Sequence, residues 1–173
     1  MKNDKWIIKI FIITFIIALL FNTFSNTITN KFDDILVLTL LAIVFILIGI
    51  IFDMIGTAVL TAEESTFHAK SSKKIIGGKE GVYLIKNSSK IASICNDIIG
   101  DICGIVSGSI SAMISLLLSS TFKISPTLTI IIISSIISSI TVGGKAIGKK
   151  YAIKNSDDII FKVAKILNKF KKK

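Results

Sequence analysis

The stretch ILVLTLLAIVFILIGIIF, residues 35–52, contains no charged residue, and Thr39 is its one polar side chain. A helix needs about 20 consecutive apolar residues to cross the hydrocarbon core of a bilayer. The stretch therefore predicts a membrane-spanning helix. The composition agrees, because the chain is 51% hydrophobic and its apolar residues lie in long runs. At 173 residues we expect one domain.

Three further apolar runs cover residues 6–21, 91–118 and 128–142. Pro126 precedes the last run and is expected in the first turn of its helix. Lys9 interrupts the first run near its start, and the NTFSNT that follows offers no small-x-small site for a signal peptidase. We therefore expect an uncleaved helix with Lys9 reaching the near membrane surface. The predicted fold class is an all-α integral membrane protein with four transmembrane helices and cytoplasmic amphipathic helices beside them.

The basic residues divide unevenly between the two sides that four spans create. All 21 of them are Lys, against 11 acidic residues, and the formal net charge is +10. Four spans put 19 of the 21 lysines on one side, with Lys31 and Lys123 on the other. The positive-inside rule makes the lysine-rich side cytoplasmic, together with both termini. The absence of Arg disfavours nucleic acid as a partner. With the abundant Ile and Asn it also indicates an AT-rich bacterial genome, so we expect the bacterial inner (plasma) membrane.

Two cytoplasmic segments are predicted to be helical. Residues 61–90 are long enough for one or two short helices. After the fourth span, NSDD at 155–158 is a typical helix start with acids in the first turn. Apolar residues then recur at helical spacing, opposite Lys162, Lys165 and Lys169. This basic amphipathic helix lies either on the anionic inner leaflet or on the protein's own cytosolic face. The bilayer and its anionic lipid headgroups are the expected partners.

NDIIGDICG, residues 96–104, brings acidic residues into the third span. Asp97 and Asp101 are four residues apart and project from one side of a helix. An acid at membrane depth is a functional-site hypothesis by default, and hard divalent cations prefer oxygen ligands. The predicted metal site takes its oxygens from Asp97, Asn96, Asp101, Asp53, Ser135, Ser138 and Ser139. Alternatively, Lys145 pairs with Asp97 and neutralises both charges without a metal.

Gly100, Gly104 and Gly108 form a GxxxGxxxG row on one face of the third span. In lipid such a row lets another helix backbone approach closely. The row predicts either a dimer contact or packing within one chain.

No motif indicates an enzyme. GGKAIGKK, residues 143–150, imitates a phosphate-binding loop, but Lys150 stands where Ser or Thr is required and a membrane helix precedes the segment. His68 is the only histidine, which excludes a His-rich zinc site. No Ser-His-Asp arrangement is expected, because His68 lies on the predicted cytoplasmic loop far from any polar pocket. A surface role for His68 is expected.

Three segments carry motifs in a definite order: DMIGTAVLTA (53–62), CNDIIGDICG (95–104) and VGGKAIGKKYAIKNSDDIIFKVAKIL (142–167). They resemble, respectively, the Ser-x-x-Glu-Thr-Ala-Leu, Gly-Asn-Asn-x-x-Asn and Gly-Glu-x-x-Pro-Lys-x-x-Ala-x-x-Asn-Pro segments of the CorB/CNNM family of magnesium and cobalt transport proteins. In the last segment the resemblance includes Lys149 and Asn155.

The resemblance implies a three-helix transmembrane domain over residues 35–173 and makes residues 1–34 an added N-terminal membrane helix and external loop. It also implies a homodimer, with Mg²⁺ or Co²⁺ as the transported ion. Lys145 stands where the family has a Glu that helps to hold the ion, and Gly56 stands where its first-helix Glu would be. The sequence ends in KKK without the regulatory CBS domains of the family.

These observations predict a multi-pass membrane protein that resembles a Mg²⁺ or Co²⁺ transporter or is a degenerate member of that family. The alternative is a non-transporting membrane scaffold, or a lipid- or partner-binding protein, in which the Asp97–Lys145 pair is structural.

Overall fold

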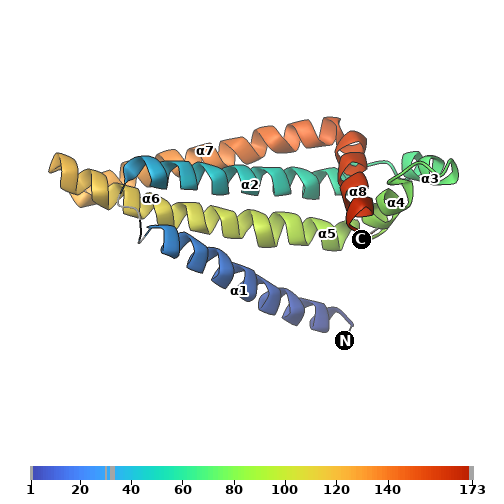
Figure 1. Ribbon diagram of the computed structural model, residues 1–173, viewed down its shortest axis with the longest axis horizontal. Helices are drawn as coiled ribbons and strands as arrows, with labels where there is room; N and C mark the ends of the chain where they lie inside the picture. The colour runs from blue at the N-terminus through green and yellow to red at the C-terminus, as the bar shows by residue number, and fades with distance from the viewer. Residues whose placement is uncertain (1, 30, 32–33, 172–173) are drawn as a thin grey trace. The chain divides into compact units, whose positions relative to one another are not determined.

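The computed structural model describes residues 2–29, 31 and 34–171, with side chains from residue 8 to residue 170. Residues 30, 32 and 33 of the predicted external loop and the last two lysines lie outside the described residues. All the regular structure in the described part is helical, and no strand occurs there (Figure 1). The elements are α1 (Lys2–Thr29), α2 (Ile35–Thr61), α3 (Glu64–Ser72), α4 (Gly78–Lys86), α5 (Ser88–Ala92), η1 (Ser93–Gly100), α6 (Asp101–Phe122), α7 (Pro126–Lys154) and α8 (Ser156–Lys171).

In the described part of the chain, four helices are long and apolar enough to cross a membrane, which agrees with the predicted number. They are the Ile8–Thr29 part of α1, the whole of α2, the continuous stretch Ser88–Phe122, and α7. Two of them begin where the sequence predicts. Asp34 Oδ1 accepts a hydrogen bond from the N–H of Leu36 at 2.9 Å at the start of α2, and Pro126 occupies the first turn of α7.

The contacts of the chain divide it into two compact units. The apolar unit comprises Met1–Ile50 and Ile98–Gly144, and the basic unit comprises Ile51–Asp97 and Lys145–Lys173. Helices α2 and α7 each contribute residues to both units, and the division at residue 34 stays a prediction.

In the apolar unit, α2 and α6 pack closely. Gly49 makes this possible, since a Cβ atom at that position would lie 3.1 Å from the Cβ of Cys103 and 3.5 Å from the carbonyl oxygen of Gly100. Phe21 of α1 meets Phe45 of α2 edge to face, with ring centroids 5.8 Å apart. The α6 face toward this core is fully buried at Cys103 and Val106.

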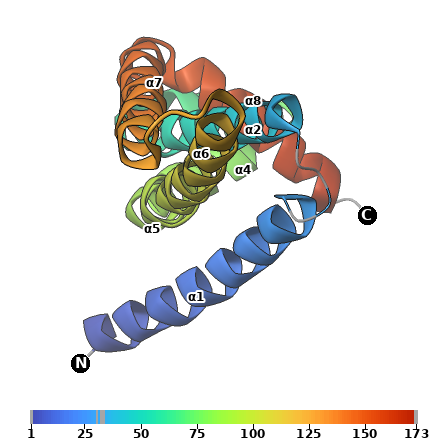
Figure 2. The same cartoon turned by 90° about the vertical axis from the view of Figure 1, so that its left-hand side faces the viewer.

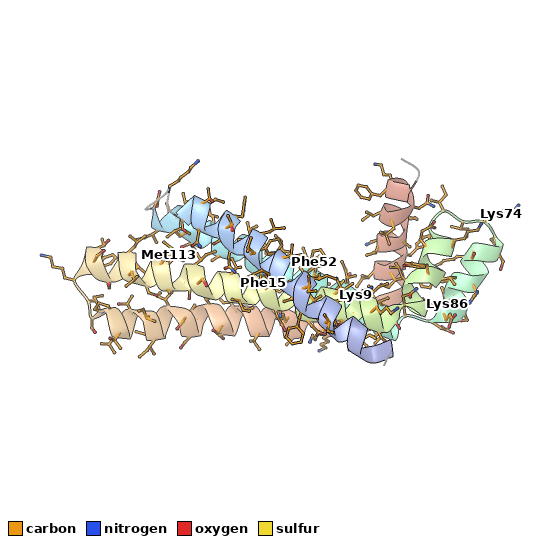
Figure 3. The ribbon with its side chains drawn as sticks, turned by 90° about the horizontal axis from the view of Figure 1, so that it is seen from below. Lys9, Phe15, Phe52, Lys74, Lys86 and Met113 are labelled. Carbon is orange, nitrogen blue, oxygen red and sulfur yellow. The ribbon has the colours of Figure 1, made fainter. Side chains whose placement is uncertain are left out.

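Helix α1 packs on α6 but leaves most of its own surface uncovered. Ser25 and Thr29, near its C-terminal end, are buried, whereas Phe11 and Phe15 are 70% and 68% exposed. Toward its N-terminal end α1 separates from α6 (Figure 2), and the Phe15 side chain projects from it (Figure 3). A contiguous apolar exterior of this kind is expected where a helix faces lipid or another helix.

The basic unit has a hydrophobic core of its own. Phe67 of α3 is completely buried, and Gly81 allows α4 to pass directly against its ring. Further along α4, Leu84 packs in the same core with Ile160 and Ala164 of α8. The prediction of one or two short helices between the second and third apolar helices is confirmed by α3 and α4.

Helix α8 has the predicted start and the predicted two faces. Asp157 and Asp158 lie in its first turn, and Asp157 Oδ1 accepts a hydrogen bond from the N–H of Glu63 at 2.9 Å. Ile160 and Ala164 pack on the protein itself, while Phe170 is 76% exposed. The first half of α8 therefore takes the second of the two predicted placements, and its last turns leave apolar side chains uncovered.

Candidate functional site

The most deeply buried acidic group of the described residues is Asp53 on α2. Its residue is 3% exposed, although an isolated carboxylate is costly to bury. Lys149 on α7 lies beside it, with Nζ 3.5 Å from Asp53 Oδ2. The Lys149 side chain is itself 49% exposed, so its ammonium group keeps contact with the exterior. An acid of α2 and a base of α7 are thus brought together inside the basic unit.

Asn96 of η1 reaches the same face of α2. Gly56 lies three residues after Asp53, one helical turn away on the same face. A Cβ atom at Gly56 would collide with Oδ1 of Asn96 and would lie 2.6 Å from its Cγ. The missing side chain of Gly56 is therefore the space that the Asn96 amide occupies, one turn from the Asp53 carboxylate.

Two side-chain oxygens in the described part of the chain are buried without a hydrogen-bond partner, and both belong to this site. They are Oδ2 of Asp53 and Oδ1 of Asn96. A buried acceptor without a donor costs about 1–3 kcal/mol, and more when it is charged. Such atoms are few in native proteins and often mark a site that takes up water or an ion.

The segment that carries Asn96 is a π-helix. Residues 93–100 form hydrogen bonds between residues i and i+5, where the sequence predicts an uninterrupted α-helix over 91–118. The wider turn rotates the side chains that precede α6 relative to those that follow. The α-helical i, i+4 relation assumed for Asp97 and Asp101 therefore does not hold through this segment. Short π-helical segments occur frequently at functional sites.

The other predicted ligands are more exposed than Asp53 and Asn96. Asp97 is exposed on η1, and Asp101 is exposed in the first turn of α6. Ser135, Ser138 and Ser139 are exposed on the part of α7 that belongs to the apolar unit. Within the described residues, no three His, Cys, Asp or Glu side chains gather closely enough to hold a metal ion. The predicted seven-residue ligand set thus stays a prediction, and the geometry places the Asn96 amide on the face of α2 that carries Asp53, one turn away.

The predicted ion pair between Asp97 and Lys145 also stays a prediction, with Asp97 exposed and Lys145 partly buried. The partner that sequence reasoning missed is Lys149, one turn further along α7. Two signals pointed to it. It is part of the quoted 142–167 motif, and the four-residue spacing puts it on the same face as Lys145.

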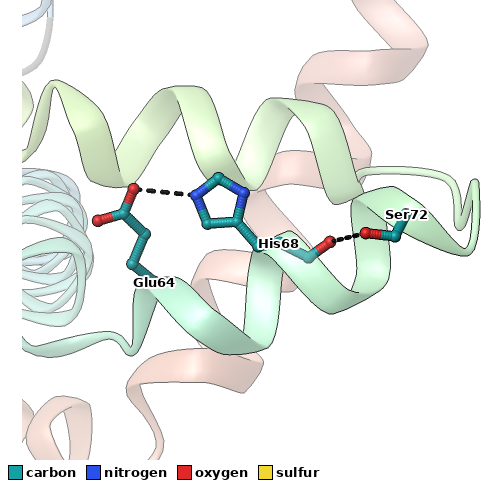
Figure 4. Close-up of polar contacts among 3 residues, drawn as sticks. All are labelled: Glu64, His68 and Ser72. Carbon is teal, nitrogen blue, oxygen red and sulfur yellow. Dashed lines mark hydrogen bonds and ion pairs between the residues drawn. The ribbon is translucent and has the colours of Figure 1, made fainter.

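His68 has the surface position that the sequence predicts. Its Nε2 lies 3.1 Å from Oε1 of Glu64, one turn earlier on α3, and both side chains are about half exposed (Figure 4). The hydroxyl of Ser72 donates to the carbonyl oxygen of His68 at 2.8 Å. These contacts all lie within one helix and involve no residue of the Asp53 site.

The glycines of the GxxxGxxxG row differ in their surroundings. Gly100 is buried, and its carbonyl takes part in the close approach to Gly49 described above. At Gly104 and Gly108 an added Cβ atom would meet nothing within 4 Å. The first glycine thus serves packing within the chain, and a dimer contact at the other two stays a prediction.

A scan against protein-family models, a search of curated proteins and a search of solved structures return no match for this chain. The resemblance to CorB/CNNM transport proteins therefore rests on the three sequence motifs.

Proposed function

We propose that this chain is a multi-pass protein of the bacterial inner membrane with both termini in the cytoplasm. Support comes from the four helices of sufficient length and apolarity, and from the exposed phenylalanines of α1. The lysine distribution supplies the orientation.

We further propose that the protein binds a divalent cation, Mg²⁺ or Co²⁺, as cargo at Asp53 and Asn96. The observation that carries this proposal is a pair of buried oxygens that accept no hydrogen bond: Oδ2 of Asp53, which has only the 3.5 Å ion pair with Lys149, and Oδ1 of Asn96. Mg²⁺ is commonly held by one or two carboxylates with several of its waters retained. One acidic side chain and one amide are therefore sufficient protein ligands for such an ion.

Lys149 acts in this proposal as the internal cation that the ion displaces. Its ammonium group neutralises Asp53 from 3.5 Å, and its half-exposed side chain is free to turn outward when a cation arrives. Exchange of one positive group for another keeps the buried carboxylate neutralised at every stage. Weak, displaceable neutralisation suits a site that must release its ion.

The ion pair itself favours a second function. In this alternative the Asp53–Lys149 pair is structural, and the protein is a membrane scaffold that transports nothing. Breaking a buried pair by removing one partner typically costs about 3–5 kcal/mol, because the other charge stays buried. Since Lys149 is half exposed, we expect the lower end of that range here.

Three variants separate the two functions when thermal unfolding is followed in detergent with and without Mg²⁺. For cation binding, Lys149→Gln is destabilised without the ion and recovers in Mg²⁺, whereas Asp53→Asn loses its response to Mg²⁺. For the scaffold, Lys149→Gln stays destabilised in Mg²⁺, and the double change Asp53→Asn with Lys149→Gln restores stability because neither charge remains.

The sequence-based ligand Asp97 provides a further test in the same assay. Asp97 is exposed, so Asp97→Ala should fold normally. If Asp53 and Asn96 hold the ion, the apparent Mg²⁺ affinity of this variant stays within about twofold of the parent's, since an exposed charge interacts weakly. Loss of the response in Asp97→Ala, with retention in Asp53→Asn, would move the site to Asp97.

A further inference from the structure

The basic unit carries nearly all of the chain's net charge. Its sequence holds sixteen lysines against seven acidic residues, a formal charge of +9 of the chain's +10. A surface of this sign attracts polyanions or an anionic membrane. The charge alone does not choose between them, and the apolar side chains beside it provide the second observation.

Exposed apolar residues of the basic unit gather over α4, α8 and the loop before α4. A hollow of about 610 Å³ lies between α4 and α8, lined by Lys79, Glu80, Tyr83, Leu167 and Phe170. A second hollow, of about 400 Å³, shares Lys79 and Glu80 with the first and extends to Ile75 and Ile76. We call Ile75, Ile76, Lys79, Tyr83, Leu167 and Phe170 the interfacial patch. Its isoleucine and aromatic members are from 42% to 76% exposed, an unfavourable arrangement in water.

Side-chain contacts join the helices that carry the patch. Asn168 of α8 donates a hydrogen bond to Oε1 of Glu80 on α4 at 3.0 Å. The Nζ atoms of Lys70 and Lys165 lie 4.3 Å and 4.2 Å from the centre of the Phe161 ring on α8, and Lys70 reaches this ring from α3. Helix α8, which carries Leu167 and Phe170, is therefore held against α3 and α4.

Lysines surround the patch. Lys79 lines both hollows, and Lys74 lines the second and projects outward from the loop (Figure 3). Lys169 is exposed next to Phe170 on α8. Aromatic and aliphatic groups ringed by lysines are typical of surfaces that enter the headgroup region of anionic bilayers. Protein–protein interfaces, in contrast, are depleted of Lys and enriched in Arg, which this chain lacks.

We propose that the interfacial patch docks on the surface of an anionic phospholipid bilayer, with Tyr83, Leu167 and Phe170 in the headgroup region and the lysines on lipid phosphates. The proposal rests on the membrane placement proposed above, because α2 and α7 each continue from the apolar unit into this unit. It does not depend on cation binding.

The test uses the whole chain with a single fluorescent reporter. Trp6 is the only tryptophan, so Trp6→Phe with Phe170→Trp leaves one tryptophan in the patch, at a position exposed enough to accept the change. The protein is reconstituted into phosphatidylcholine vesicles with and without phosphatidylglycerol, and the lipids carry bromine atoms as quenchers. We expect a blue-shifted emission and strong quenching with phosphatidylglycerol, and weaker quenching without it.

Two double variants that lose the same charge test whether the lysines beside the patch attract the anionic lipid. Lys74→Gln with Lys79→Gln should reduce the quenching, whereas Lys150→Gln with Lys154→Gln, which removes the same charge from exposed positions of α7, should leave it unchanged. Equal reductions would overturn docking through the patch.

Flotation of the vesicles tests the proposed membrane placement separately from the proposed lipid contact of the patch. Protein that does not float with vesicles refutes the membrane placement itself. Protein that floats with a solvent-exposed, unquenched reporter refutes the patch as a lipid contact and leaves another protein as its occupant.

Discussion

At the scale of single residues, the proposed cation site depends on the absence of a side chain at Gly56. The Asn96 amide fills the volume that any larger residue at position 56 would need, one turn from the Asp53 carboxylate. An acid at this position, as the resembled family has, would occupy the same volume. In the proposed cation site, Asn96 supplies from η1 an oxygen in place of the Glu that the resembled family has on its first helix.

Substitution of Gly56 tests whether the Asn96 amide must occupy the volume of the missing side chain. Gly56→Ala forces the Asn96 amide aside, at an overpacking cost of about 1–3 kcal/mol that the better helix propensity of Ala offsets by about 1 kcal/mol. We expect the Mg²⁺-dependent shift in unfolding temperature to disappear while the fold persists.

Gly104→Ala is the matched control for Gly56→Ala, because a Cβ atom at Gly104 meets nothing within 4 Å. It should leave the Mg²⁺ response intact and stabilise the helix by up to about 1 kcal/mol. Identical Mg²⁺ responses in the two variants would show that the position of the Asn96 amide does not matter. A loss of dimer with Gly104→Ala would instead support the dimer contact.

The sequence anticipates the types of residue at the site better than their pairing. Asp53 and Asn96 are both among the predicted oxygen donors, because a polar group inside an apolar run is conspicuous. The ion pair of Asp53 with Lys149 depends on the rotation and depth of α7 beside α2, and neighbouring lysines at positions 145, 149 and 150 offer alternatives that no spacing rule distinguishes.

At the scale of elements, the start of α8 joins two distant parts of the chain. Asp157 accepts the N–H of Glu63, and the Ser156 hydroxyl lies 3.4 Å from the carbonyl oxygen of Thr61. The end of α2 and the beginning of α8 are thereby linked by short polar contacts, which position α8 on the core formed by Phe67 and Leu84.

Asp157→Ala should therefore destabilise the protein more than Asp158→Ala. The first change removes a charged hydrogen bond and a favourable charge at the helix N-terminus, together about 2 kcal/mol. The second removes the helix-terminus interaction alone, about 0.3–1 kcal/mol, since Asp158 is exposed. Thermal unfolding of the two variants measures the difference, and equal losses would mean that the Glu63 contact contributes nothing.

Element boundaries were predictable where the chemistry is local. The NSDD start of α8 and the Pro126 start of α7 follow from capping preferences that act within one turn. The π-helix over residues 93–100 was not predictable. Its residues suit an α-helix equally well, so helix propensity does not distinguish the two kinds of helix.

At the scale of the whole molecule, the apolar runs and lysine positions specify a definite topology. Both termini and residues 61–90 should lie in the cytoplasm, with residues 31 and 123 outside. Single cysteines at Ser72 and at Lys123, introduced after Cys95 and Cys103 are replaced by Ala, should react with a membrane-impermeant reagent from opposite sides of inverted vesicles. Labelling of both from one side would contradict the four-span arrangement.

Transport of a divalent cation through the Asp53 site is tested by Mg²⁺ and Co²⁺ flux into proteoliposomes that contain the purified chain. Asp53→Asn and the exposed control Asp158→Asn are measured alongside. We expect flux in the parent and in Asp158→Asn, and none in Asp53→Asn. Equal flux in Asp53→Asn would contradict the assigned site. No flux in a folded and inserted parent would contradict transport itself and favour the scaffold in which Lys149 holds Asp53 permanently.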